Sequence, residues 1–360
     1  MIDSAHDKNL QPFHPKSSGA HESLSKDAYF FHKKGDTLFV SGRFEEAKGA
    51  YRKSLEAYQK AGDSQGAGLT LTRLGRVLEI LGEYGEARQA YQESLRIFQG
   101  SSDLQGIARS KAHLGNVCWA TGDYQEASNF LQEALSFYHI GEDLAGEAWV
   151  HDLMGNLRLA MREDEAAERH YLSSYTLVEK QGERLQVEAW NHFHLGAVAL
   201  FRGQKDGAKE RFSEALQCFV RLNDDLGQVA TLIHLGEIAC SGKNLAEAEQ
   251  HLQKALRLVL PTHCKPLLAD ALTGVAQLLK DKKEEKKAIS LLMVALSHPT
   301  CRQQTKDRMV TLILHLESNL SRHEVEGGFK WAKAVSLEEM ASAWVSAGSP
   351  KPKAKNKKQK

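Results

Sequence analysis

The sequence predicts an all-α, right-handed superhelical solenoid of seven helical hairpins with C-terminal capping helices. Three observations predict it: a unit of about 40 residues recurs, its apolar residues follow the helical period, and each unit leaves an apolar face that only its neighbour can bury. The stretch LGRVLEILGEYGEARQAYQESL at 74–95 is followed forty residues later by LGNVCWATGDYQEASNFLQEAL. A looser copy, KGDTLFVSGRFEEAKGAYRKSL, precedes it.

Four columns of the repeat agree over the seven units. A small residue recurs first, then an alanine twelve positions on, a large residue four further, and a small residue three after that. We expect the small columns to mark close approach of two helix backbones. The first column reads Gly35, Gly75, Gly115, Gly155, Gly196, Gly236 and Ala276, and the large one reads Tyr51, Tyr91, Leu131, Tyr171, Phe212, Leu252 and Leu292.

The second unit shows both helices of a hairpin. An apolar stripe runs from Leu71 to Leu81 at spacings of three and four, which is the period of one helix face. Gly82 then ends that helix, and a second stripe begins at Ala87. Aspartates in the turns are expected to start the following helices.

The ends of the chain have a different pattern. Residues 1–26 lack periodicity and are expected to be disordered, 27–298 hold the seven units, and 299–347 form capping helices. In this last part SLEE, at 336–339, is a capping box that opens a short helix. The basic tail, 348–360, is expected to be disordered.

Composition narrows the function classes. The net charge is +1, but the last ten residues hold six lysines, and without them 41 basic residues face 46 acidic ones. The body therefore does not suggest a nucleic-acid or acidic-membrane binder, and only the tail offers weak contact with RNA or an anionic surface. Five scattered cysteines, no secretory h-region and no long apolar run predict a cytoplasmic protein in a reducing compartment.

These columns resemble the tetratricopeptide repeat family, in a long version of about 40 residues. The segment ALSHPTCRQQTKDRMVTLILHLESNL, with the later FKWAKAVSLEEMASAWV, is similar to the end of the tetratricopeptide sensor regions in bacterial ATP-dependent transcriptional regulators. The chain lacks a GxxxxGK phosphate loop, and we find no room in it for a nucleotide-binding or DNA-binding domain. The resemblance therefore implies a detached sensing or docking module.

No motif for catalysis, a metal or a cofactor is present. HExxH, GxSxG, GxGxxG and paired Cys/His ligands are all missing, so we predict no enzyme and no cofactor. His113, His194 and His234 share one column, two residues before the glycine. We interpret them as polar residues at the edge of the concave face rather than as a metal site.

The concave face is the predicted binding site. Side chains at fixed offsets from the glycine should point inward, and large aromatics outside the packing columns concentrate in units three to five. Asn116 and Asn156 lie one repeat apart; the resemblance implies that they grip the backbone of an extended peptide. Alternatively, the aromatics pack into the inter-repeat connections and the asparagines are merely solvated. The candidate residues are Arg73, Arg76, Arg109, His113, Asn116, Trp119, Trp149, Asp152, Asn156, Trp190 and Phe193.

Two functions follow from this site. The leading hypothesis is a non-catalytic scaffold or adaptor that binds a protein or extended peptide in its groove. The alternative is a sensor of a small ligand or signalling peptide that controls a separate transcription factor or ATPase. We also expect an acidic or C-terminal carboxylate feature of the ligand to meet the three arginines at the N-terminal end of the groove.

Overall fold

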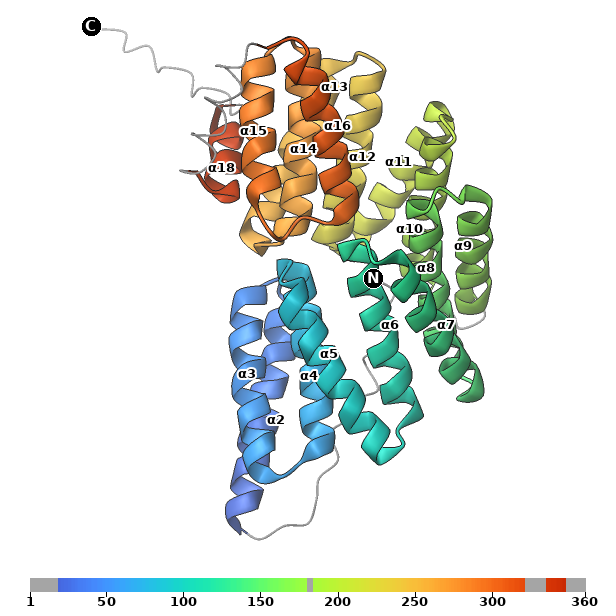
Figure 1. Ribbon diagram of the computed structural model, residues 1–360, viewed down its shortest axis with the longest axis vertical. Coiled ribbons are helices and arrows are strands. Elements are labelled where there is room, and N and C mark those ends of the chain that lie inside the picture. Colours follow the sequence, from blue (N-terminus) through green and yellow to red (C-terminus); the bar gives the residue numbers. More distant parts are fainter. Residues whose placement is uncertain (1–18, 180–183, 321–334, 348–360) are drawn as a thin grey trace, which may run out of the picture.

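Seven antiparallel helical hairpins stack one on the next in the computed structural model, which describes residues 19–179, 184–320 and 335–347 (Figure 1). Within these residues all regular structure is helical. None of the described helices is long and apolar enough to cross a membrane. The hairpins, numbered one to seven, are α2 (Gly19–Val40) with α3 (Phe44–Ala61), α4 (Ser64–Leu81) with α5 (Tyr84–Ser101), α6 (Leu104–Thr121) with α7 (Tyr124–Ile140), α8 (Leu144–Ala160) with α9 (Asp164–Glu179), α10 (Arg184–Phe201) with α11 (Lys205–Leu222), α12 (Asp225–Ser241) with α13 (Leu245–Val259), and α14 (Lys265–Asp281) with α15 (Glu285–Ser297).

Helix α2 begins at Gly19, before the predicted first boundary at residue 27. The buried Ala28 anchors this helix in the first hairpin, and adding residues to an existing helix is easier than starting a new one. The expectation of disorder is therefore wrong for residues 19–26. Its remainder, residues 1–18, lies outside the described residues, as does the basic tail.

The glycine column makes room for an aromatic ring. A Cβ atom built on Gly75 would lie 2.5 Å from the ring of Tyr91, in the second helix of the same hairpin. The equivalent Cβ on Gly35 would lie 2.5 Å from the ring of Tyr51. The large column therefore fills most of the space beside these glycines. The expected close approach of two helix backbones is seen at Gly115, whose Cβ would lie 3.3 Å from the Ala127 carbonyl oxygen.

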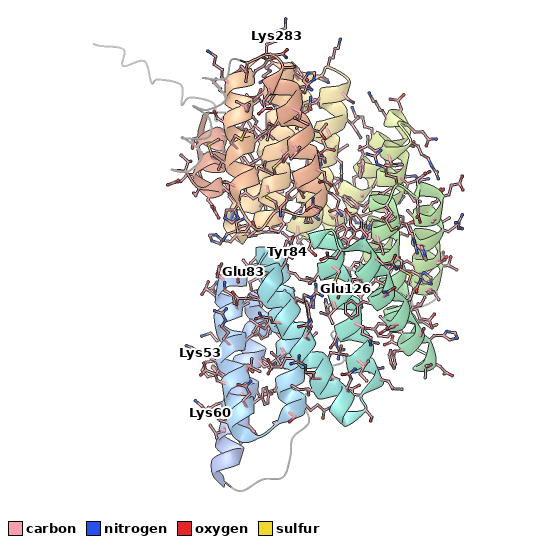
Figure 2. All side chains as sticks on the ribbon, in the orientation of Figure 1. Lys53, Lys60, Glu83, Tyr84, Glu126 and Lys283 are labelled. Atoms are coloured by element: carbon pink, nitrogen blue, oxygen red, sulfur yellow. The ribbon has the colours of Figure 1, made fainter. Side chains whose placement is uncertain are left out.

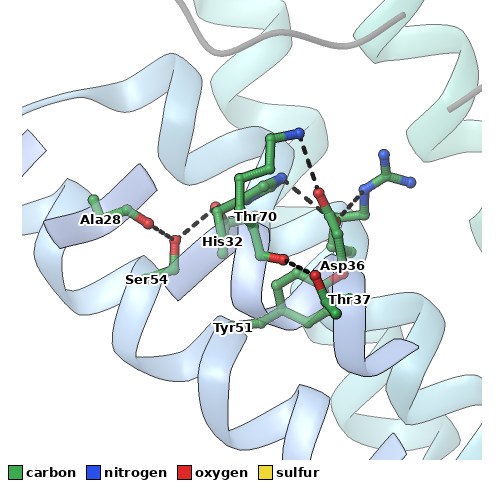
Figure 3. A network of polar contacts seen from close by, with 9 residues as sticks. Ala28, His32, Asp36, Thr37, Tyr51, Ser54 and Thr70 are labelled. Atoms are coloured by element: carbon green, nitrogen blue, oxygen red, sulfur yellow. Dashed lines mark hydrogen bonds and ion pairs between the residues drawn. The ribbon is translucent and has the colours of Figure 1, made fainter. Parts of the chain in front are cut away.

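Polar contacts recur with the same period. The Ser54 hydroxyl donates to the carbonyl of Ala28 at 2.8 Å, and forty residues later Ser94 donates to Gly68 at 3.0 Å. Figure 3 shows the first of these contacts beside the network around Asp36. Helix starts follow the predicted aspartates; for example, the Asp103 carboxylate accepts a hydrogen bond from the Gly106 amide at 3.0 Å.

The C-terminal helices contain both predicted features. Helix α16 (Gln303–Glu317) lies in the region where capping helices were predicted, and it buries Met309, Ile313 and Leu316. Helix α18 (Leu337–Ala347) starts with the capping box: Ser336 donates its backbone N–H to the Glu339 carboxylate at 2.8 Å, and Glu339 returns its own N–H to the Ser336 hydroxyl at 3.1 Å. The box is confirmed.

The solenoid also closes on itself, which the sequence did not predict. Helix α14 contacts α4, and α16 contacts α6, so hairpin seven and its cap lie against hairpins two and three (Figure 1). Tyr84 lies at the boundary between the two ends (Figure 2), and the Gln304 side chain donates to the Tyr124 hydroxyl at 3.4 Å. We call this contact the ring closure; it gives the groove a second wall and makes it a half-open pocket.

Candidate functional site

A cavity of about 480 Å³ lies inside the closed superhelix. Its wall is built mainly from the first helices of hairpins two to seven, together with α16. The size falls within the range typical of ligand sites, and the lining is mostly apolar with a few polar groups, which is also typical of them.

Nine of the eleven predicted residues line this cavity. They come from α4, α6, α8 and α10, and they form what we call the N-terminal wall. The nine are Arg76, His113, Asn116, Trp119, Trp149, Asp152, Asn156, Trp190 and Phe193.

Arg73 and Arg109 are not among the residues that line the cavity. The Arg73 side chain approaches the Asp36 carboxylate of the first hairpin at 3.6 Å. Arg109 is only 3% exposed and belongs to the interior of hairpin three. The expected group of three arginines is therefore wrong, because only Arg76 reaches the space, where its guanidinium lies 4.8 Å from the Phe39 ring.

The two asparagines are each fixed by one hydrogen bond in the wall. The Asn116 amide donates to the Glu79 carboxylate at 3.2 Å, and the Asn156 carbonyl oxygen accepts from the Tyr171 hydroxyl at 2.9 Å. Among the described residues no hydrogen bond is formed by the Asn116 carbonyl oxygen or the Asn156 amide nitrogen. The pair thus combines one acceptor and one donor group, a repeat apart, on the cavity wall.

The tryptophans of α8 and α10 belong to the core as well as to the wall. Trp149 is 4% exposed and meets the His113 ring edge-to-face at 4.8 Å; Trp190 packs on Phe219 at the same distance. The alternative of aromatic packing therefore holds for these two rings. Trp119 is less buried, and the Arg302 guanidinium lies 5.9 Å from its ring.

The histidine column packs between hairpins. The His113 ring stacks on Tyr91 at 4.5 Å, His194 on Tyr171 at 4.3 Å, and His234 on Phe212 at 4.9 Å. The His194 imidazole also lies 2.8 Å from the Asp152 carboxylate. No three histidine, cysteine or acidic side chains of the described ranges are placed to hold a metal ion.

The residues on the opposite side of the cavity were not predicted from the sequence. Asp270, Arg302, Thr305 and Arg308, from α14 and the start of α16, line it and form what we call the C-terminal wall. The Asp270 carboxylate binds the Arg302 guanidinium through one oxygen and the Thr305 hydroxyl through the other. Polar residues like these are common at the exposed start of a helix, so the sequence pattern does not mark them as a binding site. The ring closure is what places these side chains at a ligand-sized space.

Arg308 joins α16 to α12 through the Glu237 carboxylate. Burial alone would raise the pKa of Glu237, but Arg308 and His234 outweigh burial and lower the pKa to about 2. The carboxylate is therefore charged throughout the physiological range. This ion pair fixes α16 to α12 at the edge of the C-terminal wall.

Sequence and structure comparisons support the same architecture. A tetratricopeptide repeat family model matches residues 28–100, 69–140 and 106–180. No curated protein matches the chain.

Two solved structures with a similar fold are Rap proteins. A Rap protein complexed with Competence and Sporulation Factor is 14% identical, with a TM-score of 0.59, over 88% of this chain and 79% of that one. The Rap conjugation gene regulator of plasmid pLS20, in complex with the Phr* peptide, is 12% identical, with a TM-score of 0.61, over 88% and 82%. At these identities the likeness establishes the shared fold.

The matched region covers the first four hairpins, and the same hairpin architecture continues through α15. Residues 28–180 of the chain are similar to the tetratricopeptide repeat family.

Proposed function

We propose that this chain is a non-catalytic peptide sensor that binds a short peptide in its central cavity and presents the result to a separate regulator. The observation that carries the proposal is the half-open space of about 480 Å³ between the N-terminal and C-terminal walls. A short segment can contact both walls at once, whereas a long extended chain needs an open groove. The geometry thus favours the sensor over the scaffold.

The asparagine pair supports a peptide as the ligand. The Asn116 oxygen is suited to accept from a peptide N–H, and the Asn156 amide to donate to a peptide C=O. Two of the structures with a similar fold are complexes with Competence and Sporulation Factor and with the Phr* peptide. These likenesses make a peptide a sensible first class of ligand.

The test begins with peptides selected from a random hexapeptide library by the full chain. Asn116→Ala and Asn156→Ala should each weaken binding by about 1–3 kcal/mol in calorimetry, because a buried peptide group is left without its partner. Asn129→Ala, on the exposed side of α7, is the matched control and should bind like the wild type. Equal affinity for all three variants would refute the role of the pair, and failure to retain any peptide would refute the sensor proposal.

A further inference from the structure

The C-terminal wall carries two further cationic groups, Arg302 and Arg308, whereas only Arg76 of the three predicted arginines lines the cavity. This inference deepens the proposed function and rests on it. We propose that the ligand carries a carboxylate and that this group is bound by Arg302, where α16 begins at the cavity.

Arg302 has more donors than its protein partners use. A guanidinium offers five N–H donors, and the described contacts of Arg302 are one ion pair to Asp270 and the face of Trp119, 5.9 Å away. Its side chain is 26% exposed and lines the cavity. Since Thr305 holds the other oxygen of Asp270, that carboxylate fixes the direction of Arg302 while leaving donors for a ligand.

The backbone adds to the same attraction. Arg302 occupies the position before α16, and no side chain caps the helix there. The first helical turn therefore has amide groups without an intrahelical acceptor, and Gln304 and Thr305 of this turn line the cavity. The positive end of a 15-residue helix and the guanidinium thus act on one part of the space.

The acidic side chains on the opposite side of the cavity already have hydrogen-bond or ion-pair partners. Glu79 accepts from the Tyr91 hydroxyl at 2.9 Å and from Asn116 at 3.2 Å, and Asp152 lies 2.8 Å from His194. Arg302 stays protonated: burial lowers its pKa, but Asp270 and Tyr84 raise the pKa above the ordinary value. A ligand anion therefore finds an oriented cation on the C-terminal wall, and the opposite wall adds the amides of Asn116 and Asn156 beside acidic side chains that are already hydrogen-bonded or paired.

The carboxylate has two sources in a peptide, the C-terminus and an acidic side chain. The experiment uses two random hexapeptide libraries that are identical except for a C-terminal carboxylate or carboxamide, each selected on the full wild-type chain and read by mass spectrometry. Strong enrichment from the carboxylate library alone indicates the C-terminus. Enrichment of Asp and Glu within the carboxamide library indicates a side chain.

Substitutions of Arg302 test whether this side chain binds the ligand carboxylate. Arg302→Gln should weaken the selected peptides at least about tenfold, which is about 1.4 kcal/mol. Arg302→Lys keeps the charge but loses the planar fork, so it should retain part of the affinity and serves if the glutamine variant does not fold. Arg202→Gln, which removes an exposed arginine paired with Asp164 and Glu168, is the matched control.

Equal retention from both libraries without acidic enrichment, or unchanged binding by both Arg302 variants, would overturn the carboxylate proposal and leave the peptide sensor standing. Retention of no peptide from either library would overturn the sensor proposal and this one with it.

Discussion

The core of hairpins three to five and the core of the ring closure are built from different kinds of contact. The first joins residues between Ala108 and Phe219, and each packs on its own hairpin or the next. The second joins residues 38–117 with residues 226–341, at opposite ends of the chain. The comparison teaches that repeat packing and superhelix closure are separate properties: one is set unit by unit, and the other depends on the summed rotation of all units.

The largest expected effect distinguishes two tryptophans. Trp149→Ala should lower the free energy of unfolding by about 3–5 kcal/mol, because the ring is buried in the core of hairpins three to five. Trp119→Ala should cost less, because that half-buried ring packs only against the edge of the same core. Urea denaturation measures both. Similar losses would mean that the burial of each ring in this core does not set its cost.

Gly82→Ala should open the ring. A Cβ atom at Gly82 would lie 2.4 Å from the Thr300 Cβ and 2.9 Å from the Thr300 carbonyl oxygen. Gly62→Ala is the matched control, because Gly62 has a similar φ of +69° against +77° and no atom within 4 Å of its Cβ. Both variants strain a left-handed residue, but only Gly82→Ala adds a clash, which should cost about 1–3 kcal/mol more.

Small-angle X-ray scattering measures whether the superhelix opens. The radius of gyration should increase for Gly82→Ala and remain at the wild-type value for Gly62→Ala. If the two variants scatter alike, the contact at Thr300 does not hold the ends together.

A smaller effect should appear at acidic pH. Glu237 has a folded pKa of about 2 against an ordinary value of 4.5, so its ion pair with Arg308 contributes stability above pH 4.5. That contribution should be lost as the pH falls from about 4.5 to about 2, and we expect it to be about 1–2 kcal/mol. Glu237→Gln should remove this part of the pH dependence in thermal melts between pH 5 and 2. An unchanged profile would show that other groups cause the acid loss.

Each hairpin could be predicted from the sequence because its determinants lie within one repeat. The Gly75 and Tyr91 columns, the Asp103 cap and the Ser336–Glu339 box all act over a few residues or one helix pair. The positions of the N-terminal wall followed from the same period, although Arg109 packs in the interior and Arg73 turns to Asp36.

The C-terminal wall could not be predicted in the same way. Arg302 and Trp119 are brought together because each of several hairpins is rotated slightly relative to the one before. The total rotation cannot be predicted from the sequence pattern of any one hairpin. Sequence alone therefore indicated a groove with one wall, whereas the structure has a half-open pocket between two walls.

The ring closure can be tested by a disulfide between its two sides. A Cβ atom built on Gly122 lies 3.2 Å from the Gln303 Cβ, so a small outward shift brings the two atoms to the roughly 3.5–4.5 Å that a disulfide needs. In the Gly122→Cys, Gln303→Cys double variant, mild oxidation should give a cross-link that peptide mapping assigns to these positions. A Gly42→Cys, Gln303→Cys control should give none, since nothing lies within 4 Å of the Cβ at Gly42. Absence of the first cross-link, or equal formation of both, would contradict a closed superhelix and with it the cavity.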